Sequence, residues 1–164
     1  MRVITIAALA TALLASPAYA SQTGAVTLSP QAQEKFDHVY GANEAAALSA
    51  KISEQLGAAL DARGVAADKS VRIETAIIEA TPDRPTYKQL AETVTLDRTN
   101  SYGLGGAILD ARLVDSSGRV LSEVHDNWYA NDLRLARTND TWQSADRAIA
   151  HFANKVADTL AGTN

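Results

Sequence analysis

The sequence predicts an α+β domain in which a small antiparallel sheet has two long amphipathic helices packed on one face. Two segments, near residues 43–63 and 141–160, repeat apolar side chains at helical spacing. Three others, near 71–80, 107–114 and 119–129, have the β-branched or alternating residues typical of strands. This order contains too few strand–helix alternations for a doubly wound parallel sheet.

The composition is that of one globular domain: the chain has 164 residues, of which 46% are hydrophobic and 21% charged. Its formal net charge of −4 argues against a nucleic-acid partner, because phosphate binding relies on positive charge. The chain contains no cysteine, which excludes disulfides, zinc–thiolate sites and thiol nucleophiles. We predict no cofactor, no metal, no membrane span and, without a lipid-bearing cysteine, no lipid anchor.

The first twenty residues have the pattern of a secretory signal. One basic residue precedes an apolar run at residues 3–15, and Ala18-Tyr19-Ala20 is a small-x-small cleavage site. The apolar run is too short to span a membrane. We therefore expect residues 1–20 to be a signal peptide cleaved after Ala20, and residues 21–164 to form a single periplasmic domain. Secretion from the cell is the alternative.

The N-terminal half opens with a short strand at Val26–Leu28. Ser29-Pro30 then has the cap and first-position residues of a short helix. Asn43 is a candidate cap for the first long helix, and Gly64 is a candidate terminator. The apolar stripe of this helix consists of Leu48, Ile52, Leu56 and Leu60.

A long connection, Thr81–Tyr102, follows the strand at 71–80. Pro82 and Pro85 exclude a central strand there. Thr86 with Gln89 three residues later is typical of a capped helical turn. Connections of this length are often functional or mobile.

The hairpin has two possible registers. A turn at residues 115–118 with Gly118 favours a three-residue loop with a bulge, whereas the apolar pattern favours an even loop. We favour the even loop, because it keeps the apolar residues of both strands on one side. It would place Arg112 opposite Glu123 and Asp110 opposite His125.

The last helix has Asp140 as a candidate cap, with Gln143 three residues later as in a capping box. Its apolar stripe consists of Trp142, Ala145, Ile149, Phe152, Val156 and Leu160.

Binding residues are expected in two places. Arg84, Tyr87 and Lys88, in a proline-restricted segment, could present a cation and an aromatic ring to a partner or anion. A rigid connection anchored by Arg84 is the alternative. Trp128 and Tyr129, after the hairpin, could line a ligand groove, or they could pack into the core.

Two weaker motifs remain. Gly103–Gly106 is glycine-rich, but it precedes a strand instead of a helix, which favours close backbone packing over a phosphate cradle. His125 with Glu123 and Asp126 could serve as a general base with acidic neighbours. The histidine spacing brings no three ligands together, so an ordinary surface histidine is the alternative and no metal site is predicted.

Several motifs together resemble a group of small exported proteins of Gram-negative bacteria, a domain-of-unknown-function family. They include Tyr40-Gly41-Ala42-Asn43-Glu44, Pro82-x-Arg84-Pro85-Thr86, Gly103-Leu104-Gly105-Gly106-Ala107 and Trp128-Tyr129-x-x-Asp132. The resemblance covers about Val26–Leu160 and implies no activity or catalytic residue. In element order alone, the chain is also similar to envelope lipoproteins of outer-membrane assembly and curli secretion, which use small α+β domains for protein contacts.

The leading hypothesis is a non-enzymatic periplasmic protein of the cell envelope that binds a protein partner or a small ligand. Its contact residues would be Arg84, Tyr87, Lys88, Trp128 and Tyr129. A periplasmic hydrolase using His125 with Glu123 or Asp126 is the second hypothesis. A structural or assembly factor without a defined site is the third.

Overall fold

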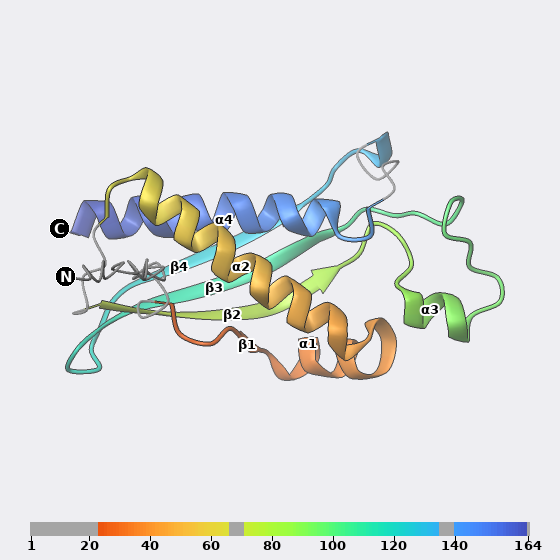
Figure 1. The fold of residues 1–164 in the computed structure, drawn as a ribbon, viewed down its shortest axis with the longest axis horizontal. Helices are drawn as coiled ribbons and strands as arrows, with labels where there is room; N and C mark the ends of the chain where they lie inside the picture. The colour runs from red at the N-terminus through yellow and green to blue at the C-terminus, as the bar shows by residue number, and fades with distance from the viewer. Residues whose placement is uncertain (1–22, 66–70, 135–139, 164) are drawn as a thin grey trace, which may run out of the picture.

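The computed structural model describes residues 23–65, 71–134 and 140–163; the expected signal peptide lies outside these residues. One four-stranded sheet runs through the molecule, and two long helices lie along it (Figure 1). The elements are β1 (Thr27–Leu28), α1 (Pro30–Lys35), a π-helical turn η2 (Phe36–Tyr40), α2 (Ala42–Ala62), β2 (Val71–Thr81), α3 (Tyr87–Glu92), β3 (Gly106–Asp115), β4 (Val120–Tyr129) and α4 (Gln143–Thr163).

The α+β fold class is confirmed, with one correction to the sheet. The strand order is β1-β2-β3-β4, and the two pairs that involve β3 are antiparallel. The short edge strand β1, however, runs parallel to β2, so the sheet is mixed. The reason is that α1, η2 and α2 lie between these strands and return the chain to the start of β2 in the same direction.

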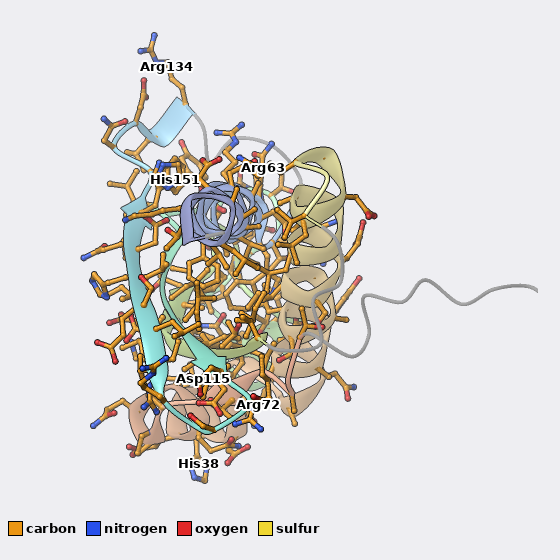
Figure 2. All side chains as sticks on the ribbon, turned by 90° about the vertical axis from the view of Figure 1, so that its left-hand side faces the viewer. His38, Arg63, Arg72, Asp115, Arg134 and His151 are labelled. Carbon is orange, nitrogen blue, oxygen red and sulfur yellow. The ribbon has the colours of Figure 1, made fainter. Side chains whose placement is uncertain are left out.

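The core lies between the sheet and the two helices. Figure 2 shows α4 and α2 on the same side of the sheet, with side chains filling the space between the layers. Every residue of the two predicted apolar stripes is buried. The side chains that the core receives from β3 include Leu109, Ala111 and Leu113, as the alternation predicts. None of the helices in the described residues is long and apolar enough to cross a membrane.

Three predicted helix signals are confirmed. The Ser29 side chain accepts a hydrogen bond from the Ala32 amide at 3.1 Å, with Pro30 in the first turn of α1. At α3, the Thr86 hydroxyl accepts from the Gln89 amide, and the Gln89 side chain accepts from the Thr86 amide. Gly64 has φ +61°, which ends α2 in the left-handed conformation.

The predicted cap of α2 is wrong. α2 begins at Ala42, directly after Gly41, and no side chain caps it. Gly41 has φ +108°, and its amide donates to the Phe36 carbonyl at 2.8 Å. The helix η2 therefore ends, and α2 begins, at this one residue. Asn43 therefore lies inside the first turn, where its side chain is not at the cap position.

An aromatic cluster joins η2 to the start of α4. The rings of Phe36, Tyr40 and Trp142 lie with their centroids 5.6 to 5.9 Å apart. The Trp142 indole also donates to the Glu44 carboxylate at 2.6 Å. This cluster fixes the end of the molecule at which β2 ends and β3 begins.

The hairpin contains both the three-residue loop that the turn residues favour and the strand pairing that the apolar pattern favours. The Asp115 amide donates to the Arg119 carbonyl across a three-residue loop, and Gly118 has φ +85°, so the even loop was wrong. The extra residue Leu121 then shifts the register by one position. As a result, the pairs that the even loop implied are present: Arg112 with Glu123, and Asp110 with His125.

The hairpin turn should make the free energy of unfolding depend on pH in the acidic range. Hydrogen bonds from the Ser117 side chain and the Arg119 amide lower the pKa of Asp115 from 3.8 to about 2. A lowered pKa means that Asp115 stabilises the fold above pH 3.8, and that this contribution is lost as the pH falls toward about 2. The Asp115→Asn variant should therefore be less stable than wild type in urea at neutral pH, and the two should become equally stable as the pH falls through about 2. A difference that persists at the lower pH would contradict this assignment.

Candidate functional site

The segment between β2 and β3 contains most of the predicted binding residues. It projects beyond the end of the sheet, with α3 on one side (Figure 1, right). Two residues at its start, Asp83 and Arg84, are 1% and 5% exposed. Buried charged side chains are rare unless they are paired or hydrogen-bonded, so both should have a defined role.

Asp83 attaches the segment to the N-terminus of α4. Its carboxylate accepts hydrogen bonds from the Ser144 amide at 2.7 Å and the Ser144 hydroxyl at 2.6 Å. It also accepts from the Gly105 amide at 3.3 Å. Since the amides of the first helical turn have no partner within the helix, Asp83 caps α4 from a distant part of the chain. The predicted cap Asp140 accepts from the Trp142 amide at 3.2 Å, but Trp142 precedes the first residue of α4.

Arg84 attaches the other side of the segment. Its Nη1 donates to the Arg98 carbonyl at 2.9 Å and to the Thr99 carbonyl at 2.7 Å. Its guanidinium also lies over the Tyr102 ring, 5.7 Å from the centroid. The structure thus places Arg84 inside the loop, in the anchoring position that the sequence offered as the alternative to a contact residue.

Of the other two predicted residues of the segment, Tyr87 lies on its surface and Lys88 is half-buried. Tyr87 is 73% exposed, and the guanidinium of Arg98 lies 4.9 Å from its ring centroid. Lys88 pairs with Glu92 one helical turn later. Apolar side chains of the same segment are exposed as well. We call this set of exposed side chains the loop end; it consists of Tyr87, Val94, Tyr102 and Leu104.

A shallow cavity of about 280 Å³ lies beneath the loop end. It opens between the loop and η2, and its lining includes Tyr40, Gln89, Leu96 and Tyr102. The loop end therefore combines exposed apolar side chains with a depression that could accept one side chain of a partner.

Trp128 and Tyr129 do not lie together, because consecutive strand residues face opposite sides of the sheet. Trp128 packs against the core. Tyr129 lies on the face without helices, next to Gly106, where an added Cβ would meet the Tyr129 ring at 2.7 Å. Burial raises the pKa of Tyr129, an effect that the nearby Thr81 side chain partly offsets.

The three residues of the hydrolase hypothesis are also divided between the two faces. His125 and Glu123 lie on the face without helices, and His125 Nδ1 is 2.6 Å from Asp110. Asp126 is buried on the other face. The structure does not bring these residues into one cluster. In the part of the chain that it describes, no group of three or more histidine, aspartate or glutamate side chains could hold a metal ion.

Asp126 instead connects β4 to α4. His151 Nδ1 lies 2.8 Å from its Oδ2, and Lys155 Nζ lies 3.4 Å from its Oδ1 (Figure 2, where His151 is labelled). Lys155 also donates to the His125 carbonyl on β4 at 2.6 Å. The sequence did not indicate this cluster, since its members come together only when α4 packs over β4.

Comparison with known proteins gives limited information. No protein-family model matches the chain, and no curated protein is similar enough in sequence to count as a match. A solved structure that resembles it is described as a "putative lipoprotein" from Caulobacter crescentus CB15, a Gram-negative bacterium. The similarity has a TM-score of 0.42 at 16% identity, over 90% of this chain and 94% of the other. At that level it supports no inference about function.

One prediction is corrected by this comparison. The missing cysteine predicts no lipid anchor, but the similar structure is described as a "putative lipoprotein", and lipoproteins carry such an anchor. The prediction that this protein has no lipid anchor is therefore withdrawn.

Proposed function

We propose that this protein is an exported, non-enzymatic component of the Gram-negative cell envelope that binds a protein partner through the loop end. The observation that carries the proposal is the combination of exposed apolar side chains with buried anchors. Tyr87 and Val94 are exposed, whereas Asp83 and Arg84 attach the same loop to the domain.

The buried anchors Asp83 and Arg84 favour binding because they hold the loop in one conformation. A flexible loop loses conformational entropy when it binds, which weakens the complex, whereas a preorganised loop has lost that entropy on folding. Function is often carried by loops held on a rigid scaffold, and exposed apolar surface often marks an interaction site. Tyr87 and Lys88 remain proposed contact residues, and Arg84 becomes a positioning residue.

The proposed location in the periplasm rests on the signal pattern of residues 1–20. Protein purified from the periplasm should begin at Ser21. A purified chain that still begins at Met1 would contradict the signal-peptide prediction.

The loop end can be tested by combining Tyr87→Ala with Val94→Ser. The double variant should fold normally, because both side chains are exposed, but it should lose most of a specific envelope cross-link. Replacing two apolar contacts at the centre of an interface typically weakens binding by about 2 kcal/mol or more. The measurement is photo-crosslinking in whole cells from the neighbouring exposed position 95, which the double variant leaves unchanged, followed by quantification of the partner in pull-downs.

A double variant on the outer surface of α2, Lys51→Ala with Glu54→Ala, is the control. These two residues form an exposed ion pair away from the loop. The control should retain the cross-linked partner at the wild-type level. If both double variants retain the same partners, the loop end is not the binding surface.

A further inference from the structure

The face of the sheet without helices carries a second, independent feature. All four strands contribute to a hollow of about 670 Å³ there, which is large enough for a small-molecule ligand. Its lining is divided by side-chain size. Small residues form the β1 side and the floor: Gly24, Ala25, Thr27 and Ala76. Ionisable side chains form most of the rest of the rim: Arg72, Glu74, Asp110, Arg112, Glu123 and His125.

Ala76 explains why the surface is hollow at this place. It pairs with Thr27 on β1 and with Asp110 on β3, so a small side chain lies in the middle of a row. The next row toward the other end of the sheet contains Glu74, Arg112 and Glu123. Long side chains in one row beside short ones in the next leave a depression on an otherwise solvated face.

The charges of the rim alternate in sign. Arg112 lies between two carboxylates, 3.7 Å from that of Glu74 and 3.6 Å from that of Glu123. These distances are too long for hydrogen bonds, and no described residue hydrogen-bonds with the Arg112 side chain. Its planar guanidinium is therefore in position to bind a carboxylate with two parallel hydrogen bonds.

The chemistry of the rim excludes several ligand classes. Two arginines face three carboxylates, so a phosphate group or a nucleic acid would be repelled as strongly as it is attracted. Apart from the His125 imidazole, the described lining contains no aromatic ring on which a sugar or a base could stack. A molecule with one positive and one negative end fits both signs of the rim.

We propose that this hollow binds a small zwitterionic molecule of the amino-acid or short-peptide class. The carboxylate of the ligand would lie against Arg112, with Arg72 beside it, and its ammonium group would lie against Asp110. The body of the ligand would cover Ala76. This site is separate from the loop end, and neither proposal depends on the other.

The test uses three probes built on one dipeptide: Ala-Ala, its N-acetylated form and its C-terminal amide. Binding is followed by ¹H–¹⁵N chemical-shift changes at the amides of Ala76, Asp110 and Arg112. Ala-Ala should shift these amides with saturation at concentrations up to about 10 mM. Each blocked form should bind at least about tenfold more weakly, because it lacks one charged end.

Two variants and one control locate the site. Ala76→Leu should fill the hollow and abolish binding while the protein stays folded, since this residue faces solvent. Arg112→Gln should weaken binding of Ala-Ala about tenfold or more, but should change binding of its C-terminal amide little. Arg119→Gln, an exposed arginine at the hairpin turn, should have no effect.

Two results would overturn the proposal. One is that all three probes bind equally or none binds. The other is that Ala76→Leu binds Ala-Ala as wild type does. The loop-end experiment measures a different surface, so its failure would leave this result unchanged.

Discussion

Replacing Asp83 with alanine should lower the free energy of unfolding by about 3 kcal/mol, one of the two largest effects that we expect from a single substitution. The variant leaves the Ser144 amide and hydroxyl and the Gly105 amide without their common acceptor, in a site closed to water. A buried donor that loses its partner typically costs about 1–3 kcal/mol. The measurement is equilibrium unfolding in urea.

Two further variants separate the carboxylate from the general effect of a substitution. Asp83→Asn keeps the shape and one acceptor oxygen, so it should fall between wild type and Asp83→Ala. Asp97→Ala removes a carboxylate that also accepts from two backbone amides, those of Thr99 and Asn100, but at an exposed turn. It should have a much smaller effect, because water replaces the lost acceptor. Equal losses in Asp83→Ala and Asp97→Ala would contradict the role of burial.

The second large effect is expected at Gly106. Alanine is normally preferred to glycine inside a strand, by about 0.5–1 kcal/mol. At Gly106 alanine should instead be less stable than glycine, because a Cβ at this position would lie 2.4 Å from the Trp128 carbonyl and 2.7 Å from the Tyr129 ring. Backbone of the neighbouring strand cannot give way as a flexible side chain can. Gly106→Ala should therefore destabilise the protein by about 2–3 kcal/mol.

Gly103→Ala is the matched control for that prediction. It lies three residues earlier, its φ is not positive, and nothing stands within 4 Å of an added Cβ. Thermal unfolding should show a clear loss of Tm for Gly106→Ala and almost none for Gly103→Ala. If Gly106→Ala is as stable as wild type, the ring of Tyr129 does not lie against β3 as described.

Local chemistry explains why many elements could be predicted from the sequence. The stripe Leu48, Ile52, Leu56 and Leu60 repeats every four residues over a long segment, a spacing that places all four side chains on one face of a helix. The cap at Ser29, the capping box at Thr86 and the terminator at Gly64 each involve residues within a few positions of one another. Signals of this kind operate before any tertiary contact forms.

The hairpin shows where local reasoning reached its limit. The turn residues and the strand pattern each gave a valid signal, and the two conflicted only if the strands were regular. Leu121 removes the conflict as a bulge, but no residue type marks a bulge at that position. The register was settled by burial of the apolar side chains of β4 against the helices.

The candidate site was predictable only in part. Tyr87 is on the surface, as a binding role requires, and Lys88 is half-buried. Arg84 and Asp83 have the same local character as any charged loop residue, and their burial depends on where α4 and residues 98–105 lie. The pairing of Asp126 with His151 likewise needs a helix packed over a strand.

The sequence by itself determined the helices, the strands and most of their ends, together with the α+β class, because propensity, periodicity and capping act over a few neighbouring residues. The tertiary structure decided which charged residues are buried as anchors, which apolar residues remain exposed at the loop end, and where the free sheet face is hollow. Those properties depend on the contacts between segments that are distant in the chain, and the burial of a polar group is favourable only when such a contact supplies its hydrogen-bond partner.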